Sequence, residues 1–355
     1  GMTGKRNINV GAPHAVAAGA GLAAALLFSL AQQGTVVAMV LAYLSPLPIM
    51  IATLGFGRLS GLAAAALGTL VTGALVILHQ PRALWSASLI GAGIAAFGFA
   101  ASLGLPAFWL ALLATLGKMK PTDSREIGRD TLQSLPRDYY LLERILTHAV
   151  LIATALVAAA VIWISIHNGG FNAAVDKAAT AIDPLIDKLI GRDIELPGGI
   201  EIHDLARLVV LAAAPAVAGS SLVMFMLNLW LAGRVVQVSG RLTRPWPDIP
   251  RFLRLPRVFA PIFAVAFIAA FAGGLPGLLA AILATALGVA FALQGLATVH
   301  ALSRGASFRT PLLFAVYLGL TLLMPWPLVL FTLIGLAEAI FSLRDRKAGE
   351  AFPRH

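Results

Sequence analysis

The sequence contains no cysteine and few charged residues. Without cysteine among its 355 residues it can form no disulfide, no thiolate metal site and no cysteine nucleophile. Charged residues make up 12% of the chain and hydrophobic residues 59%, whereas a soluble domain carries roughly 25% charged residues. This composition predicts an all-α polytopic transmembrane helix bundle in a plasma membrane.

Several catalytic motifs are also missing. The sequence has no Gly-x-x-x-x-Gly-Lys-Ser/Thr loop for nucleotide phosphates, no His-Glu-x-x-His and no Gly-x-Ser-x-Gly. Its seven histidines include no pair four residues apart, and acidic residues are rare inside its apolar runs. We therefore expect neither an enzyme nor a cofactor or metal site; a membrane-embedded enzyme is the least favoured alternative.

The net charge of +10 comes mainly from arginines and lysines in short loops beside apolar runs. This pattern is typical of loops facing an anionic inner leaflet rather than of nucleic-acid binding. It predicts a single membrane domain over residues 1–355, in a bacterial inner membrane, with both termini cytoplasmic and about ten crossings, eight being the alternative count. The predicted crossings are residues 14–31, 35–56, 59–78, 84–103, 141–166, 205–233, 258–271, 277–300, 311–324 and 328–343. Residues 107–116 are expected to be re-entrant or interfacial, because Lys118 and Lys120 belong inside.

Three connecting segments have distinct charge patterns. Residues 118–140 mix acids and bases and predict a cytoplasmic loop, either a solvated helix or a partner-docking surface. Residues 169–204 are rich in acids and predict an extracytoplasmic segment. Within that segment, apolar residues at helical spacing predict an amphipathic helix: Phe171, Val175, Ala178, Ile182, Leu185 and Leu189.

Residues 234–257 form the most basic segment and predict a rigid cytoplasmic loop. Its four prolines and Trp246 disfavour a regular helix. Anionic lipid or an acidic cytoplasmic partner is the expected contact. The candidate docking residues are Arg234, Arg241, Arg244, Arg251, Arg254 and Arg257.

Small residues recur every four positions in two of the predicted helices, which favours close approach of another helix. In the first helix they are Gly11, Ala15, Gly19 and Ala23, which favour a retained helix over a cleavable signal peptide. In the third they are Gly57, Gly61, Ala65, Thr69 and Gly73.

Pro46 and Pro48 interrupt the second apolar run near its middle. Because proline has no N–H, carbonyls of the preceding turn lose their helical donors. In hydrocarbon such carbonyls must be covered by protein, water or a ligand. The sequence therefore predicts either a simple kink or a break that lines a cavity, beside which Tyr43 and Ser45 become candidate ligand contacts.

Three more polar residues are embedded in apolar runs. Glu338 is the one well-embedded carboxylate, and it either contacts a ligand or pairs with Arg344 or Arg58. Asn228 and Gln294 are isolated amides, suited to interhelical hydrogen bonds or to ligand contact.

Two short motifs resemble an uncharacterised bacterial family of polytopic membrane proteins. The first is Tyr43-x-Ser45-Pro46-Leu47-Pro48, and the second is Gly335-Leu336-Ala337-Glu338 followed by Arg344-Asp345-Arg346. That family is distantly similar to the substrate-binding S components of energy-coupling-factor transporters. The resemblance implies an S-component-like core that binds a small molecule and works with a separate ATPase module.

Together these features favour a non-enzymatic membrane protein that binds or transports a small molecule or lipid. The candidate ligand contacts are Tyr43, Ser45, Pro46, Pro48, Asn228, Gln294 and Glu338. The alternative is a membrane scaffold or assembly factor whose basic inner loops dock a cytoplasmic partner. Partners other than the bilayer are then the ATPase module or another membrane protein, and not nucleic acid.

Overall fold

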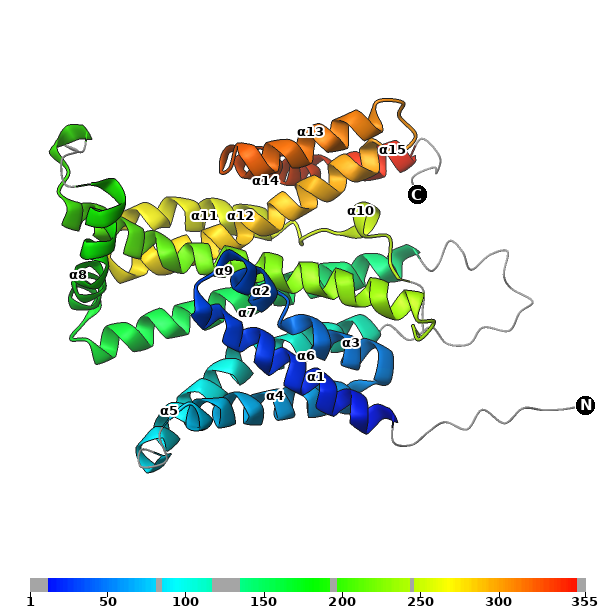
Figure 1. The fold of residues 1–355 in the computed structure, drawn as a ribbon. Helices are drawn as coiled ribbons and strands as arrows, with labels where there is room; N and C mark the ends of the chain where they lie inside the picture. Colours follow the sequence, from blue (N-terminus) through cyan, green and yellow to red (C-terminus); the bar gives the residue numbers. More distant parts are fainter. Residues whose placement is uncertain (1–11, 81–84, 117–134, 192–196, 243–245, 350–355) are drawn as a thin grey trace, which may run out of the picture. The chain divides into compact units, whose positions relative to one another are not determined.

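Seven helices are long and apolar enough to cross a bilayer in the computed structural model, which describes residues 12–80, 85–116, 135–191, 197–242 and 246–349. Within these ranges every regular element is helical and no β-strand occurs, so the predicted all-α class is confirmed (Figure 1). The seven are Ala12–Gln33, Val36–Phe56, Arg58–Leu78, Ser88–Thr115, Leu141–His167, Ile202–Val238 and Gly274–Leu302. The chain therefore has the character of a membrane-spanning protein.

Three further apolar helices coincide with predicted crossings but are shorter. They are Phe259–Ala272, Arg309–Leu322 and Trp326–Phe341. At about 1.5 Å per residue, helices of this length fall short of the roughly 30 Å hydrocarbon core. The ten predicted segments are thus all helical, and seven of them have spanning length.

The chain divides into two compact units. Unit 1 comprises Gly1–Ile145 and Met224–Pro247, and unit 2 comprises Leu146–Val223 and Asp248–His355. The helices α7 (Leu135–His167) and α9 (Ile202–Val238) have residues in both units. The other elements of unit 1 are α1 (Ala12–Ser29), η1 (Leu30–Gln33), α2 (Val36–Tyr43), α3 (Pro46–Phe56), α4 (Arg58–Leu78), α5 (Trp85–Phe99), η3 (Ala100–Gly104) and α6 (Leu105–Thr115).

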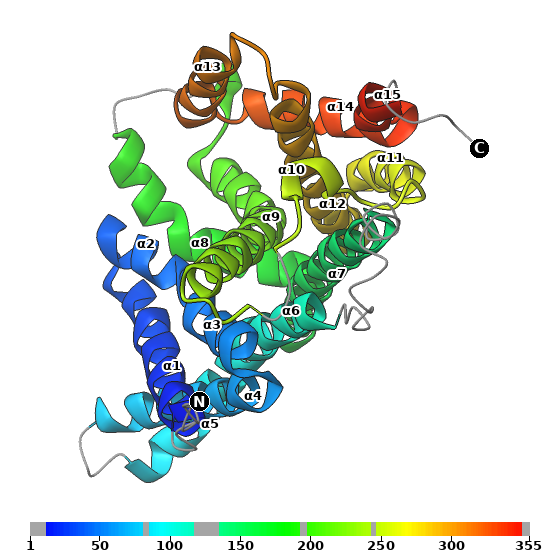
Figure 2. The same cartoon turned by 90° about the vertical axis from the view of Figure 1, so that its right-hand side faces the viewer.

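In unit 1, α4 packs against α1, α3 and α5 (Figure 2). The small-residue face predicted for this helix is confirmed at Gly61 and Gly73, which are buried. A side chain at Gly61 would overlap that of Thr53 on α3. The face predicted for α1 is wrong as a packing face within the chain: Gly19 is exposed, and instead Gly21 is buried against the backbone of α4.

The prediction that residues 107–116 form a re-entrant or interfacial piece is also wrong. Residues Ser88–Thr115 form one continuous helical span, in which the π-helical turn η3 joins α5 to α6. Pro106 lies in the first turn of α6, where the wider turn preceding it accommodates the missing N–H. Residues 107–116 therefore continue the span rather than form a separate re-entrant piece.

The elements of unit 2 surround α12 (Gly274–Leu302), which contacts α8, α10, α11, α14 and α15. The others are α8 (Phe171–Ile190), η4 (Pro197–Gly199), α10 (Ile249–Phe252), α11 (Phe259–Ala269), η5 (Ala270–Ala272), α13 (Arg309–Leu322), α14 (Trp326–Phe341) and α15 (Leu343–Gly349). Two glycines bring α12 and α14 together, since a side chain at Gly295 would overlap the carbonyl oxygen of Phe331 and one at Gly335 that of Phe291. The sequence analysis missed this crossing.

The helix predicted within residues 169–204 exists as α8, but the residues that it buries are only partly the expected ones. Ala179 and Ile186 form a small apolar core with Ala206 at the start of α9, and Ile182 of the expected stripe packs against it. Leu185 and Leu189 belong to the expected stripe but are 57% and 76% exposed. The apolar side of α8 is therefore wider than its contact with α9.

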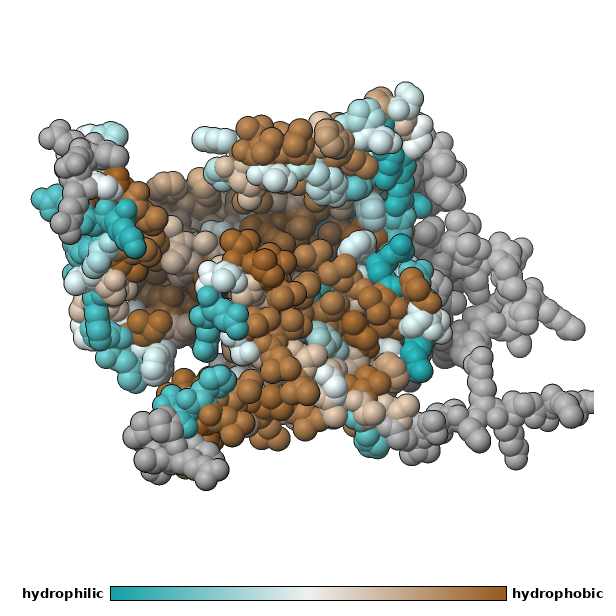
Figure 3. All heavy atoms as spheres, viewed as in Figure 1, coloured by the Kyte–Doolittle hydropathy of each residue, from teal (hydrophilic) through white to brown (hydrophobic). Residues whose placement is uncertain are grey.

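Three segments of unit 2 that the ten-crossing topology puts on the inner side meet at one end of the unit. They are residues 248–257, 303–309 and 344–347. Arg304 pairs with Asp248, Arg254 pairs with Asp345, and the Lys347 ammonium donates to the carbonyl of Leu302. Within unit 2, Figure 3 shows hydrophilic residues near α15 and again at α8, and hydrophobic surface on α11 and α13. The sidedness itself remains a prediction; the grouping of the three segments agrees with it.

Candidate functional site

The proline break in unit 1 is closed by protein groups. Ala42 and Leu44 lose the N–H groups that residues 46 and 48 would donate in a regular helix. The carbonyl of Ala42 accepts instead from the backbone N–H and the hydroxyl of Ser45. The carbonyl of Leu44 accepts the N–H of Leu47 at 3.1 Å.

In a regular helix the N–H of Leu47 would donate to the carbonyl of Tyr43. Because it donates to the carbonyl of Leu44 instead, the carbonyl of Tyr43 has no helical donor. Asn228 on α9 supplies the replacement: its Nδ2 donates to the carbonyl oxygen of Tyr43 at 2.9 Å and to that of Met224 at 2.7 Å. Ser45 and Asn228 are both fully buried. The interhelical role predicted for Asn228 is therefore confirmed, and no carbonyl of the break requires a ligand.

Asn228 nevertheless retains an unused acceptor. Its Oδ1 is buried and has no hydrogen-bond partner among the described residues. Turning the amide over would direct this oxygen at two carbonyl oxygens, so the observed orientation is the favourable one. A ligand role for Tyr43, Ser45, Pro46 and Pro48 stays a prediction that these contacts do not test.

In unit 2 the embedded polar residues support irregular backbone. Gln294 of α12 accepts the backbone N–H of Leu255 at 2.9 Å. The guanidinium of Arg344 donates to the carbonyl oxygens of Pro250 and Leu253 at 2.9 and 2.8 Å. These bonds satisfy backbone groups of residues 248–257, which form a loop between α9 and α11 with only one short helix.

Glu338 and Arg344 form a buried ion pair, which confirms one of the two pairings expected for Glu338. The Nε of Arg344 lies 2.9 Å from Glu338 Oε1, and its backbone N–H lies 3.1 Å from Oε2. Their side chains are 1% and 2% exposed. Burial lowers the pKa of Arg344, and the hydrogen bond and charge of Glu338 oppose that effect.

Only some of the six arginines expected to dock lipid or partner are free to do so. Arg254 is buried beside Asp345, so the expectation of an accessible docking cation is wrong for that residue. Arg241 lies over the ring of Phe56 at 4.3 Å, and Arg251 lies 5.2 Å from that of Phe252. Arg234 and Arg257 are exposed. Arg244 lies outside the described residues, as do residues 118–134 of the predicted 118–140 loop.

Asp248 and Arg304 form a second ion pair in the same region, near the surface. The two guanidinium nitrogens lie 2.6 and 2.7 Å from the two carboxylate oxygens. This hydrogen bond from Arg304 is the main cause that lowers the pKa of Asp248. The pair fastens the start of the 248–257 loop to the turn that follows α12.

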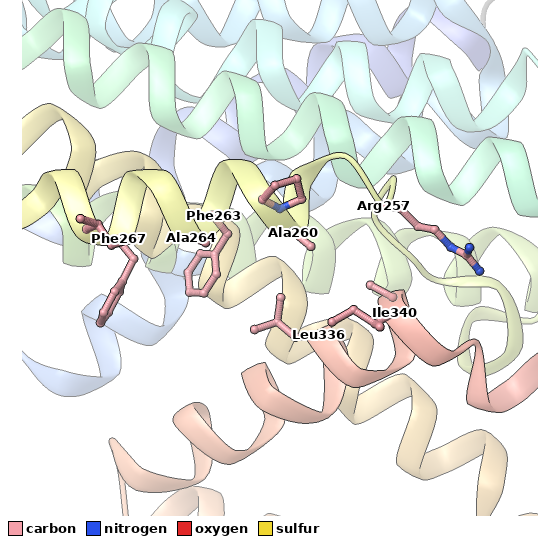
Figure 4. A pocket seen from close by; sticks show the side chains of 10 residues that line it. Arg257, Ala260, Phe263, Ala264, Phe267, Leu336 and Ile340 are labelled. Carbon is pink, nitrogen blue, oxygen red and sulfur yellow. The ribbon is translucent and has the colours of Figure 1, made fainter.

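An apolar groove in unit 2 is a cavity that the sequence patterns did not predict. It runs between α11 and α14 over α12 and has two adjoining parts of about 660 and 510 Å³, which share Phe263, Phe267 and Leu336. Figure 4 shows Phe263 and Phe267 from α11 facing Leu336 and Ile340 from α14, with Arg257 at one end. Phenylalanines at positions 263, 267 and 271, four residues apart, were the available signal.

The groove has the size of a small-molecule site and almost no polar lining. Ligand pockets in proteins commonly measure about 300–1,000 Å³. Apart from Arg257 at one end, polar side chains enter its lining only at Thr285 and Thr332. The single hydroxyl proton of Thr332 is already shared between the carbonyl oxygens of Leu328 and Gly288, 2.8 and 3.0 Å away. The groove therefore suits an apolar chain rather than a sugar or a nucleotide.

Among the described residues, no three His, Asp or Glu side chains are grouped so that they could hold a metal ion. Comparison of the chain with known protein families, with curated proteins and with solved structures found no match.

Proposed function

We propose that this chain is a non-enzymatic membrane component that binds a lipid or another small amphipathic molecule in the groove between α11 and α14. The observation that carries the proposal is the apolar lining of that groove, formed by aromatic rings from one helix and aliphatic side chains from another. We place the ligand here rather than beside Pro46 and Pro48, because the carbonyls of that break have protein partners.

The proposal includes a bacterial inner-membrane location with ten crossings and cytoplasmic termini. The gathering of the 248–257, 303–309 and 344–347 segments at one end of unit 2 supports that topology. The resemblance to S components adds a separate ATPase module as the partner that would couple binding to transport. The alternative function, a scaffold that docks a partner through basic loops, is less favoured because Arg254, one of its candidate docking residues, is buried and paired with Asp345.

A groove-filling substitution tests the proposal. Ala264 lines the groove on α11 and is exposed within it, so Ala264→Trp places an indole where the ligand would lie. Ala269 is also exposed on α11 but does not line either part, which makes Ala269→Trp the matched control. The three proteins would be purified in mild detergent, and their bound lipids and metabolites quantified by mass spectrometry.

We expect about one bound molecule per chain in the parent and in Ala269→Trp, and a loss of most of it in Ala264→Trp. Equal loading of all three proteins would contradict the proposal. Co-purification of a protein partner, with no bound small molecule in the parent, would favour the scaffold instead.

A further inference from the structure

Arg257 differs from the three paired arginines near it. Arg254, Arg304 and Arg344 each form an ion pair with a carboxylate: Asp345, Asp248 and Glu338 respectively. Among the described residues, Arg257 forms no ion pair, and its NH2 donates instead to the neutral hydroxyl oxygen of Ser342. It is exposed, so its charge remains available to an anion.

The position of Arg257 is as informative as its charge. It forms one end of the apolar groove, beside Ile340 and just before α11 begins (Figure 4). Arg257 and Phe267 are ten positions apart, which corresponds to about 15 Å at the rise of an α-helix. That length equals about half of the roughly 30 Å hydrocarbon core, the depth of one leaflet.

The local geometry suits a phosphate. A guanidinium carries five N–H donors, of which Ser342 uses one, and it binds phosphate oxygens in pairs. The hydroxyl of Ser342 accepts from Arg257 and can donate its own proton to the same anion. Ser342 is held there by a left-handed backbone conformation, with φ of 50°, at the end of α14.

We propose that the groove binds an anionic phospholipid of the inner leaflet, with one acyl chain against Phe263, Phe267 and Leu336 and the phosphate at Arg257 and Ser342. This inference rests on the proposed function and specifies the ligand class. The positive charge of Arg257 favours an anionic headgroup over a neutral apolar molecule. Arg257 is also predicted to lie on the cytoplasmic side, where anionic lipids concentrate.

The test measures headgroup preference separately from total binding. The purified protein would be exchanged into nanodiscs with equal amounts of phosphatidylglycerol and phosphatidylcholine, and the lipids retained after extraction into detergent would be counted by native mass spectrometry. Arg257→Gln removes the charge at the groove. Arg58→Gln, at an exposed arginine of unit 1 outside the candidate docking residues, is the control for nonspecific attraction of anionic lipid.

The parent and Arg58→Gln should retain phosphatidylglycerol over phosphatidylcholine by about fivefold, the effect expected of one cation near the surface. In Arg257→Gln the preference should disappear while the total number of bound lipids stays the same. A parent that binds lipid without preference, or a preference that survives in Arg257→Gln, would overturn this inference and leave the proposed function standing. A parent that retains no lipid would overturn both.

Discussion

The α2–α3 break in unit 1 and the 248–257 loop in unit 2 both interrupt helical backbone, but they are stabilised differently. At the break, Ser45 satisfies the carbonyl of Ala42, the N–H of Leu47 satisfies that of Leu44, and one amide, Asn228, satisfies that of Tyr43. The loop requires Gln294, the Glu338–Arg344 pair and two further ion pairs. A longer irregular segment exposes more backbone groups, and each buried one needs a partner.

The buried ion pair of unit 2 should be the most costly to break. Glu338→Gln leaves the charge of Arg344 uncompensated in a buried site, and such losses cost about 3–5 kcal/mol. Unfolding in mixed detergent, followed by circular dichroism, measures the change. Asp248→Asn is the matched control, because the pair that it breaks is partly exposed and worth at most about 1 kcal/mol. Equal costs would show that burial does not set the strength of these pairs.

Helix packing in unit 1 offers a comparison within a single helix. Gly21→Leu forces a side chain into the backbone of α4, where a Cβ would already lie 2.6 Å from the carbonyl oxygen of Ala64. We expect a loss of about 1–3 kcal/mol or failure to accumulate. Gly19→Leu adds the same side chain at a site with no atom within 4 Å and should be nearly neutral. Thermal unfolding in detergent measures both variants. A Gly19→Leu variant that melts below Gly21→Leu would contradict the assignment of Gly21 to the contact with α4.

The break in unit 1 can be tested with a double-mutant cycle. Asn228→Leu leaves the carbonyl of Tyr43 unsatisfied, which costs about 1–3 kcal/mol. Replacing Pro46 and Pro48 with alanine restores two N–H donors, so the N–H of Leu47 can return to Tyr43. The cost of Asn228→Leu should therefore be smaller in the double-alanine background. An identical cost in both backgrounds would mean that the prolines are not the reason for the Asn228 bond.

The surface pair of unit 2 should produce the smallest effect, and one that depends on pH. The Arg304 hydrogen bond lowers the pKa of Asp248 in the folded protein below the ordinary aspartate value of about 3.9. Its contribution to stability is therefore complete above about pH 4 and is lost as the pH falls through the folded pKa. The difference in unfolding midpoint between the parent and Asp248→Asn should be constant from pH 7 to pH 5 and shrink below pH 4. A difference that grows on acidification would reverse the sign of this linkage.

The sequence predicted the elements better than the contacts. Apolar length and loop charge identified all ten helical segments, and two prolines located the break, because these signals are local. The partners of buried polar residues could be predicted from the sequence only where few residues of opposite charge were available, as for Glu338 and Arg344. The α1 packing face was misassigned because several small-residue lines lie on that helix, and only the position of α4 selects Gly21 over Gly19. The groove was missed because three phenylalanines on one face do not reveal whether a neighbouring helix covers them.

Two proposals depend on the membrane topology of unit 2: that the basic loop is cytoplasmic, and that Arg257 binds an anionic lipid of the inner leaflet. Because the chain has no cysteine, single cysteines can be introduced without background labelling. Lys188→Cys on α8 and Arg346→Cys on α15 are at exposed positions. On intact cells, a membrane-impermeant thiol reagent should label position 188 and leave position 346 unlabelled until the cells are permeabilised. Labelling of position 346 but not of position 188 on intact cells would contradict the topology and, with it, the placement of Arg257 at the inner leaflet.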